Sequence, residues 1–272
     1  MVGTVTRPQR EGDKEINKLA PGLSVFATYA ESFVPGTQIL LVRNELTTPA
    51  QPTEGRGVDV GVKADLFGGR LTGTLALFEV RNRSIVNAIA ELDPATGSQV
   101  FTLVQSGTQR SRGVEVDLTL TPVDDWQVYL SYSYNDARIV EFSANDQAVL
   151  AGGPSMPGYK DVFLFHNARL QMSAPHLANL WTRYDLTRSF LKGLYVAGGF
   201  NLVVDQTLLP DSDQRQSYVL LNATVGYSHE WVPGFALSIE LWGKNLANEH
   251  YRPSQSSRSR PRELGVQVRG KY

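Results

Sequence analysis

A strict two-residue alternation between Glu54 and Glu79 constrains the fold of this chain more than any other feature. In its first half, apolar residues occupy every second position from Val58 to Leu66, with charged residues or glycine between them. Successive side chains of a β-strand point to opposite faces, so this pattern predicts a ribbon with one apolar and one charged face. Residues 67–70 (Phe-Gly-Gly-Arg) predict a tight turn, because glycine accepts the positive φ of short hairpin turns. A second alternating run follows directly, and the sequence therefore predicts a β-hairpin.

The same pattern recurs along the chain and predicts an antiparallel meander of about ten strands. Besides the hairpin, we expect strands at 22–31, from 100 past 113 to 121, and at 126–139, 176–186, 194–204, 217–229, 235–246 and 262–272. Short connections at 67–70, 122–125, 187–193 and 230–234 alternate with long ones at 32–52, 84–99, 140–174, 205–216 and 252–260. All tight turns then lie at one end and all long loops at the other, which is typical of transmembrane β-barrels.

Three further features favour a membrane barrel over a soluble β-sandwich, whose strands also alternate. The expected strands have about 10 to 14 residues, whereas soluble strands have about five or six and tilted membrane strands about 9 to 11. Aromatic residues lie near strand ends, as interfacial girdles require: Phe26, Tyr29, Phe78, Trp126, Tyr132, Tyr134, Tyr184, Tyr227, Trp231, Phe235, Tyr251 and Tyr272. Charged residues recur at period two, which suits a hydrated lumen: Asp59, Lys63, Asp65, Glu79, Arg81, Glu115, Asp117, Arg183, Asp185, Glu240, Lys244, Glu263, Arg269 and Lys271.

The composition excludes several classes of function. A formal net charge of -1 over 272 residues provides no basic field for nucleic acid. The absence of cysteine excludes disulfides, thiolate metal sites and cysteine nucleophiles. Residues 1–21 are polar and largely without a period, and we interpret them as a disordered or fragmentary lead-in that lacks the apolar core of a signal peptide. An exported form would therefore be longer at the front, or the chain is a piece.

No pattern predicts catalysis, a cofactor or a metal. The histidines His166, His176, His229 and His250 lack an HExxH or paired spacing, which favours surface roles over a metal site. No G-x-S-x-G elbow precedes a helix, so we predict that the chain is not an enzyme.

Arg110 and Arg112 are the most suggestive charged pair. Arginine forks bind anions, so the pair fits an anionic ligand or lipopolysaccharide phosphates. An ion pair with a nearby carboxylate such as Glu115 is the interpretation that we favour. Ligand contact is expected in the long loops, where Tyr159, Phe163, Phe165 and Arg169 are of the types that hold an aromatic, anionic iron chelate. Loop packing explains these four residues equally well, and we assign no binding residue.

Several segments, taken in order, resemble the C-terminal half of a TonB-dependent outer-membrane receptor of the ferric-siderophore branch. They are Ser24 to Pro35 (SVFATYAESFVP), 54–82, 106–137 with Gly107 and the run RSRGVE at 110–115, 175–181 (PHLANLW) with Tyr184, Lys192-Gly193-Leu194 with Gly198-Gly199, Asn245-Leu246-Ala247-Asn248 with Tyr251, and Pro261-Arg262. The resemblance implies that residues 22–272 are an all-β, antiparallel, transmembrane β-barrel segment. It would hold about ten of the family's 22 strands and no plug domain.

The family's role implies energy-coupled uptake of ferric siderophores across a bacterial outer membrane. The implied partners are a ferric siderophore, the lipid bilayer with its lipopolysaccharide, and the TonB complex acting through an N-terminal part outside these residues. An open sheet leaves unpaired edges in hydrocarbon, so we expect that this segment alone is not transport-competent. Two alternatives stay open: a passive pore or structural outer-membrane barrel, and a soluble carbohydrate-binding β-protein.

Overall fold

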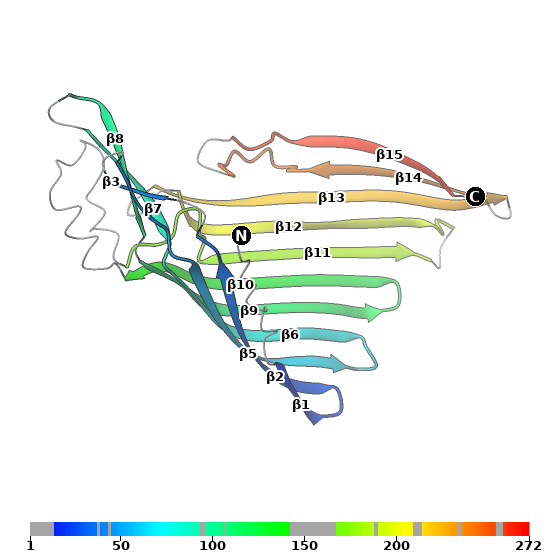
Figure 1. The fold of residues 1–272 in the computed structure, drawn as a ribbon. Coiled ribbons are helices and arrows are strands. Elements are labelled where there is room, and N and C mark those ends of the chain that lie inside the picture. The colour runs from blue at the N-terminus through cyan, green and yellow to red at the C-terminus, as the bar shows by residue number, and fades with distance from the viewer. Residues whose placement is uncertain are drawn as a thin grey trace, which may run out of the picture.

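A single antiparallel sheet of eleven strands dominates the computed structural model. The structure describes residues 14–36, 39–42, 45–92, 96–105, 107–141, 167–187, 190–208, 214–232, 235–253 and 258–271. No helix in these ranges is both long and apolar enough to cross a membrane. The strands lie side by side in one layer, with the short turns together at one end and the longer connections at the other (Figure 1).

The sheet follows chain order throughout, as a meander does. Its strands are β1 (Lys14–Ala20), β2 (Leu23–Val34), β5 (Thr53–Leu66), β6 (Leu71–Arg83), β9 (Thr108–Val123), β10 (Trp126–Glu141), β11 (His176–Leu186), β12 (Leu194–Thr207), β13 (Arg215–Val232), β14 (Phe235–Lys244) and β15 (Glu263–Lys271). Two separate hairpins project at the long-loop end: β3 (Ile39–Val42) with β4 (Glu45–Pro49), and β7 (Val86–Leu92) with β8 (Gln99–Gln105) (Figure 1). The predicted all-β antiparallel meander is confirmed.

The predicted hairpin turn is also present. Phe67, Gly68 and Gly69 all have positive φ (56°, 65° and 85°), and β5 pairs with β6 in continuous register on either side. The other short connections likewise join neighbouring strands at the same end of the sheet. Local turn chemistry therefore determines the alternation of short and long connections.

The structure differs from the sequence expectation in three places. The long connections 32–52 and 84–99 contain the hairpins β3–β4 and β7–β8 rather than irregular loop alone. The strand expected to run from Val100 past Gly113 is interrupted, because β8 ends at Gln105 and belongs to a different sheet from β9. Part of the expected lead-in forms strand β1, whose backbone pairs with β2 although its sequence shows no apolar period.

The apolar stripes lie on one face of the sheet, and no second layer covers them within the described residues. Across the middle of the sheet, Leu118, Leu130, Leu180, Phe200 and Leu221 are consecutive cross-strand partners. Exposure is high on this face, for example 43% for Leu221. We call it the outward face, and the opposite one the inward face.

Aromatic residues border the outward apolar band at both ends. At the long-loop end, Tyr132 and Tyr134 contact the ring of His176, and the Tyr132 hydroxyl lies 2.9 Å from its Nδ1. At the short-turn end, Trp126 is the cross-strand partner of Tyr184. The nine residues from Trp126 to Tyr134 span about 26 Å of strand, close to the height of a membrane barrel's apolar band. The side chains of three other predicted girdle residues, Trp231, Phe235 and Tyr272, lie outside the described part.

The predicted assignment of charges to the inward face holds for most positions and is wrong for two. Glu79 and Arg81 follow Leu75 and Leu77 at period two, so they share the outward face with these leucines. They lie where β6 extends beyond the apolar band toward the long loops. These positions are still on the outward face, but they are no longer part of the apolar band. The side chain of Lys271 is outside the described residues.

Candidate functional site

A ladder of polar side chains crosses the inward face from β10 to the end of β14. Asn179 donates from Nδ2 to Ser131 Oγ (3.1 Å), and Asn201 donates to Asn179 Oδ1 (2.6 Å). Asn222 donates to Asn201 Oδ1 (3.0 Å) and accepts from the backbone N–H of Asn245 (3.1 Å). These residues occupy the inward positions of neighbouring strands, so the same alternation that creates the apolar face places them in line.

The inward face is hollowed around this ladder. A concavity of about 1080 Å³ extends from β2 across to β13, and Lys63, Asp117, Tyr129, Trp181 and Asn201 are among the residues that line it. Its walls combine charged, aromatic and amide groups. Such a surface suits a polar, hydrated occupant.

A charged cluster lies on the inward face toward the short-turn end. Arg183 donates to Asp185 (Nη2–Oδ1 2.7 Å) and lies over the ring of Tyr195, with its guanidinium carbon 3.8 Å from the ring centroid. The Tyr195 hydroxyl in turn donates to Glu240. Gly226 makes room for this tyrosine, because a Cβ there would lie 2.2 Å from the ring. The predicted inward positions of Arg183, Asp185 and Glu240 are confirmed by this network.

At the long-loop end, Gln105 joins the bases of the two projecting hairpins. Its Nε2 donates to the backbone oxygens of Gln51 and Ser84, and its Oε1 accepts from the backbone N–H of Gln51 (2.5 Å). Thr53 also donates to the oxygen of Ser84 (3.0 Å). One side chain therefore fixes two segments that are more than thirty residues apart in the sequence.

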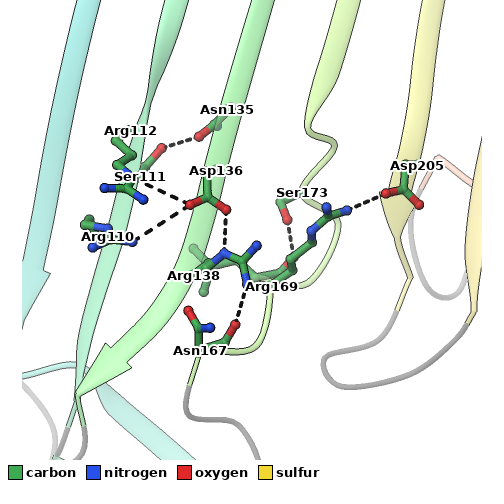
Figure 2. Close-up of polar contacts among 11 residues, drawn as sticks. Arg110, Ser111, Arg112, Asn135, Asp136, Arg138, Asn167, Arg169, Ser173 and Asp205 are labelled. Atoms are coloured by element: carbon green, nitrogen blue, oxygen red, sulfur yellow. Dashed lines mark hydrogen bonds and ion pairs between the residues drawn. The ribbon is translucent and has the colours of Figure 1, made fainter.

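Arg110 and Arg112 do not pair with Glu115. The interpretation favoured from the sequence, an ion pair with that carboxylate, is therefore wrong. Figure 2 shows both guanidiniums directed at Asp136 of β10, at 3.8 Å and 3.6 Å. The reason is strand parity: Glu115 is an odd number of residues from either arginine and points to the other face, whereas Asp136 is the cross-strand partner of Arg112. The pair is on the outward face, beyond the aromatic border.

Arg169 is the one predicted ligand-contact residue that the structure describes. Its Nη1 lies 2.5 Å from Asp205 Oδ2 (Figure 2). Arg215 contacts the same oxygen at 3.0 Å. Arg169 is thus held by an ion pair at the rim of the sheet. Tyr159, Phe163 and Phe165 lie outside the described residues, so their predicted role is untested.

The described histidines are dispersed. His176 belongs to the outward aromatic border, and His229 stacks on Tyr227 at 6.1 Å between ring centroids. No three His, Asp or Glu side chains within the described ranges are grouped so that they could hold a metal ion. His166 lies outside these ranges.

The comparisons with known proteins agree with this geometry. A family model described as TonB dependent receptor-like, beta-barrel, matches residues 16–246. The chain belongs to this family. It is accordingly a segment of an outer-membrane β-barrel receptor.

Individual relatives support the same family. An uncharacterized TonB-dependent receptor of Haemophilus influenzae is 28% identical over 247 residues, covering 89% of this chain and 63% of the relative. The ferrioxamine B receptor of Salmonella typhimurium is 24% identical over 85% of this chain and 28% of its own length. The chain thus spans less than two thirds of the first of these relatives and about a quarter of the second.

Solved structures show the same fold. The ferric preacinetobactin receptor BauA of Acinetobacter baumannii matches with a TM-score of 0.71 at 20% identity, over 94% of this chain and 35% of the receptor. The pyoverdine receptor FpvA of Pseudomonas aeruginosa matches with a TM-score of 0.65 at 18% identity, over 96% of this chain and 35% of the receptor. The eleven-stranded sheet therefore corresponds to about a third of each of these receptor chains.

The residues that carry the resemblance to TonB-dependent receptors have clear structural roles. Gly113, in the run RSRGVE, lies where β9 and β10 approach closely, because a Cβ there would be 1.7 Å from the backbone oxygen of Tyr134. Asn245 is buried with a φ of 49° and bonds to three backbone groups: it donates to the oxygens of Glu249 and Arg260 and accepts from the N–H of Glu249. The first motif permits close strand packing, and the second shapes the connection before β15.

Proposed function

We propose that this chain forms part of the wall and the ligand-facing loops of an energy-coupled importer for ferric siderophores. The names of the relatives support this cargo, since they include receptors for ferrioxamine B, ferric preacinetobactin and pyoverdine. Transport rather than catalysis is the proposed activity, with the ferric chelate as cargo rather than as a resident cofactor. The TonB complex would act through an N-terminal part of the receptor.

The single observation that carries the proposal is the polar inward face. The amides of Asn179 and Asn201 are exposed there, and the hollow around them has charged and aromatic walls. A lipid-facing or tightly packed surface would not keep such groups solvated. A plug or a hydrated iron chelate passing along this wall would find hydrogen-bond partners at every step.

We further propose that the chain does not transport on its own. Strands β1 and β15 each pair on one side only among the described strands. Every unpaired backbone group in hydrocarbon costs several kcal/mol, so both edges need partner strands. The remaining partners proposed for the receptor are the bilayer and its lipopolysaccharide.

The test supplies those partner strands. Cells without siderophore receptors of their own would express this chain, the N-terminal part of the Salmonella ferrioxamine B receptor that precedes the matched region, or a fusion of the two. Uptake of iron-55 bound to ferrioxamine B and to pyoverdine would be measured with and without a protonophore. We expect protonophore-sensitive uptake from the fusion alone. No uptake of any ferric chelate by a fusion that is folded in the outer membrane would contradict the proposal.

The two alternatives give different results for the chain alone. A passive pore produces a steady ohmic conductance in planar bilayers after refolding, whereas the importer segment produces none. A soluble carbohydrate-binding protein stays folded and monomeric without detergent. The uncovered outward face, with Leu221, Leu241 and Val266 all more than two fifths exposed, argues against the soluble form.

A further inference from the structure

The hairpin β7–β8 leaves the main sheet through a bend in each of its two connections. Ser84, between β6 and β7, has a φ of 57°, and Gly107, between β8 and β9, has a φ of 92°. On the sheet side of these bends, β6 and β9 are still paired at Arg83 and Thr108. A positive φ is uncommon within extended chain and turns it sharply. Because both connections turn at the same level, they form a hinge, which we call the β7–β8 hinge.

One side chain spans this hinge. Gln105 is the last residue of β8, and its Nε2 donates to the backbone oxygen of Ser84 across the hinge at 2.9 Å. The same nitrogen donates to the backbone oxygen of Gln51, and Oε1 accepts from the N–H of Gln51 at 2.5 Å. Thr53 donates a further bond to the Ser84 oxygen at 3.0 Å. The hinge is thus braced against the segment that connects β4 to β5.

The hairpin β3–β4 is attached through the same segment. Its two connections approach closely, because a Cβ on Gly36 would lie 2.1 Å from the backbone oxygen of Ala50. Ala50 is buried, and Gln51 follows it directly. Beyond these connections β3 lies against β8, whereas neither hairpin makes comparable contact with the main sheet among the described strands (Figure 1). The two hairpins are therefore joined to each other at their bases and again between β3 and β8.

We propose that Gln105 is a positioning residue that makes β3–β4 and β7–β8 move as one ligand-facing unit. Its three bonds to backbone groups fix the relative placement of the two bases, because each hydrogen bond has a preferred direction. Without this brace the β7–β8 hinge lets one hairpin move independently of the other, and a cargo that contacts both must first order them. The coupling of the hairpins follows from contacts within the chain, whereas its effect on cargo rests on the proposed function.

The first experiment measures the coupling directly. The chain contains no cysteine, so spin labels on cysteines introduced at Thr47 of β4 and at Ser98, just before β8, report a single distance in the fusion described above, once other cysteines are removed. We expect a narrow distance distribution in the parent and one at least about twice as wide in Gln105→Ala, since three bonds at the hinge are lost. An equally narrow distribution in Gln105→Ala would overturn the proposal.

Gln216 provides a matched control. Its Nε2 donates to the backbone oxygen of Arg252 at 2.7 Å, and its Oε1 accepts from the N–H of the same residue at 3.0 Å. Gln105 makes the same pair of bonds to Gln51, but Gln216 belongs to β13, four strands from β9 in the sheet order. Gln216→Ala should leave the distance between the hairpins unchanged. A broadening as large as that of Gln105→Ala would contradict a specific coupling through Gln105.

Two further variants separate the brace from ordinary packing. Gln105→Lys keeps a donor for the two carbonyl oxygens, whereas Gln105→Glu keeps only the acceptor and places a negative charge beside them. The distance distribution should therefore be close to that of the parent in Gln105→Lys, and as wide in Gln105→Glu as in Gln105→Ala. A packing role predicts the reverse order, because Glu has the shape of Gln. A narrow distribution in Gln105→Glu would refute the brace.

Transport by the same fusion tests the consequence for cargo. In Gln105→Ala, the concentration of ferrioxamine B that half-saturates uptake should rise about three- to tenfold, with the maximal rate within about twofold of the parent, because ordering the hairpins adds to the cost of binding rather than of translocation. Half-saturation at the parent concentration in a variant with uncoupled hairpins would overturn the role in capture. If the fusion imports no chelate, the proposed function fails, while the distance measurements still decide whether the hairpins form one unit.

Discussion

The inward and outward faces of the sheet are built from the same strands, yet they are stabilised by different interactions. The inward face is held by side-chain hydrogen bonds, such as the ladder through Asn179, Asn201 and Asn222. The outward face makes few such bonds across its middle, where Leu130, Leu180 and Leu221 lie in one row. On the outward face, the lipid environment rather than packing against a second layer decides which residues are tolerated. A substitution should therefore cost very different amounts on adjacent residues.

The largest effect is expected from a charge in the middle of the outward face. Introduced into the fusion that supplies the partner strands, Leu221→Arg should lower the free energy of unfolding in lipid vesicles by about 2–4 kcal/mol, the cost of an arginine near the bilayer midplane. Leu220→Arg, one residue away on the inward face, should cost less than about 1 kcal/mol. Urea unfolding followed by tryptophan fluorescence measures both. Equal costs would mean that the two faces have the same surroundings.

A slightly smaller effect is expected where the strands approach most closely. Gly113→Ala places a methyl group 1.7 Å from the oxygen of Tyr134, so the paired backbones must move apart. We expect a loss of about 2 kcal/mol in the same unfolding assay. Gly57→Ala is the control, because its nearest atom would be a Val80 methyl at 3.7 Å, and it should be nearly neutral. If both variants behave alike, backbone approach does not explain the glycine.

The buried asparagine before β15 should matter more than its exposed neighbour. Asn245→Ala leaves the carbonyls of Glu249 and Arg260 without a donor, and we expect a cost of about 1.5 kcal/mol. Asn248→Ala also changes an asparagine with positive φ (56°), but its side chain is exposed and accepts one bond, from Arg262. Unfolding of the two variants should differ by at least about 0.5 kcal/mol. A larger loss in Asn248→Ala would contradict the role given to Asn245.

The smallest effect is expected from the ladder itself. Asn201→Ala removes one donated and one accepted bond at an exposed position, and we expect a cost of about 0.5–1 kcal/mol. Asn201→Asp keeps the acceptor for Asn222 and should cost about half as much. A loss as large as that of Leu221→Arg would show that inward amides are as critical as outward leucines.

Patterns that depend on neighbouring residues could be predicted from the sequence. The period-two stripes and the turn at 67–70 are local, so the meander and its short connections were predicted correctly. Strand parity is local as well: the period-two rule places Arg110 and Arg112 on the face opposite to Glu115, and Glu79 on the same face as Leu77. These two side-chain directions therefore follow from the sequence, and the pairing of the arginines with Glu115 and the inward position of Glu79 do not agree with them.

Features that depend on register between distant segments could not be predicted. Asp136 becomes the partner of Arg112 only through the pairing of β9 with β10, across a turn. The hairpin β7–β8 is separate from the main sheet and is fixed at its base by Gln105, through bonds to Gln51 and Ser84. Arg56, Arg81, Arg110 and Arg138 likewise lie opposite one another only because of three strand pairings, β5–β6, β6–β9 and β9–β10.

The direction of the two edge strands limits how this wall can be closed. Strand direction alternates along the sheet, and the sheet has eleven strands. The first and the last strand, β1 and β15, therefore run in the same direction, toward the short-turn end. An antiparallel ring contains an even number of strands. Any complement that seals the gap must therefore contribute an odd number, and an added two-stranded hairpin would meet one rim with parallel polarity and could not continue the ladder.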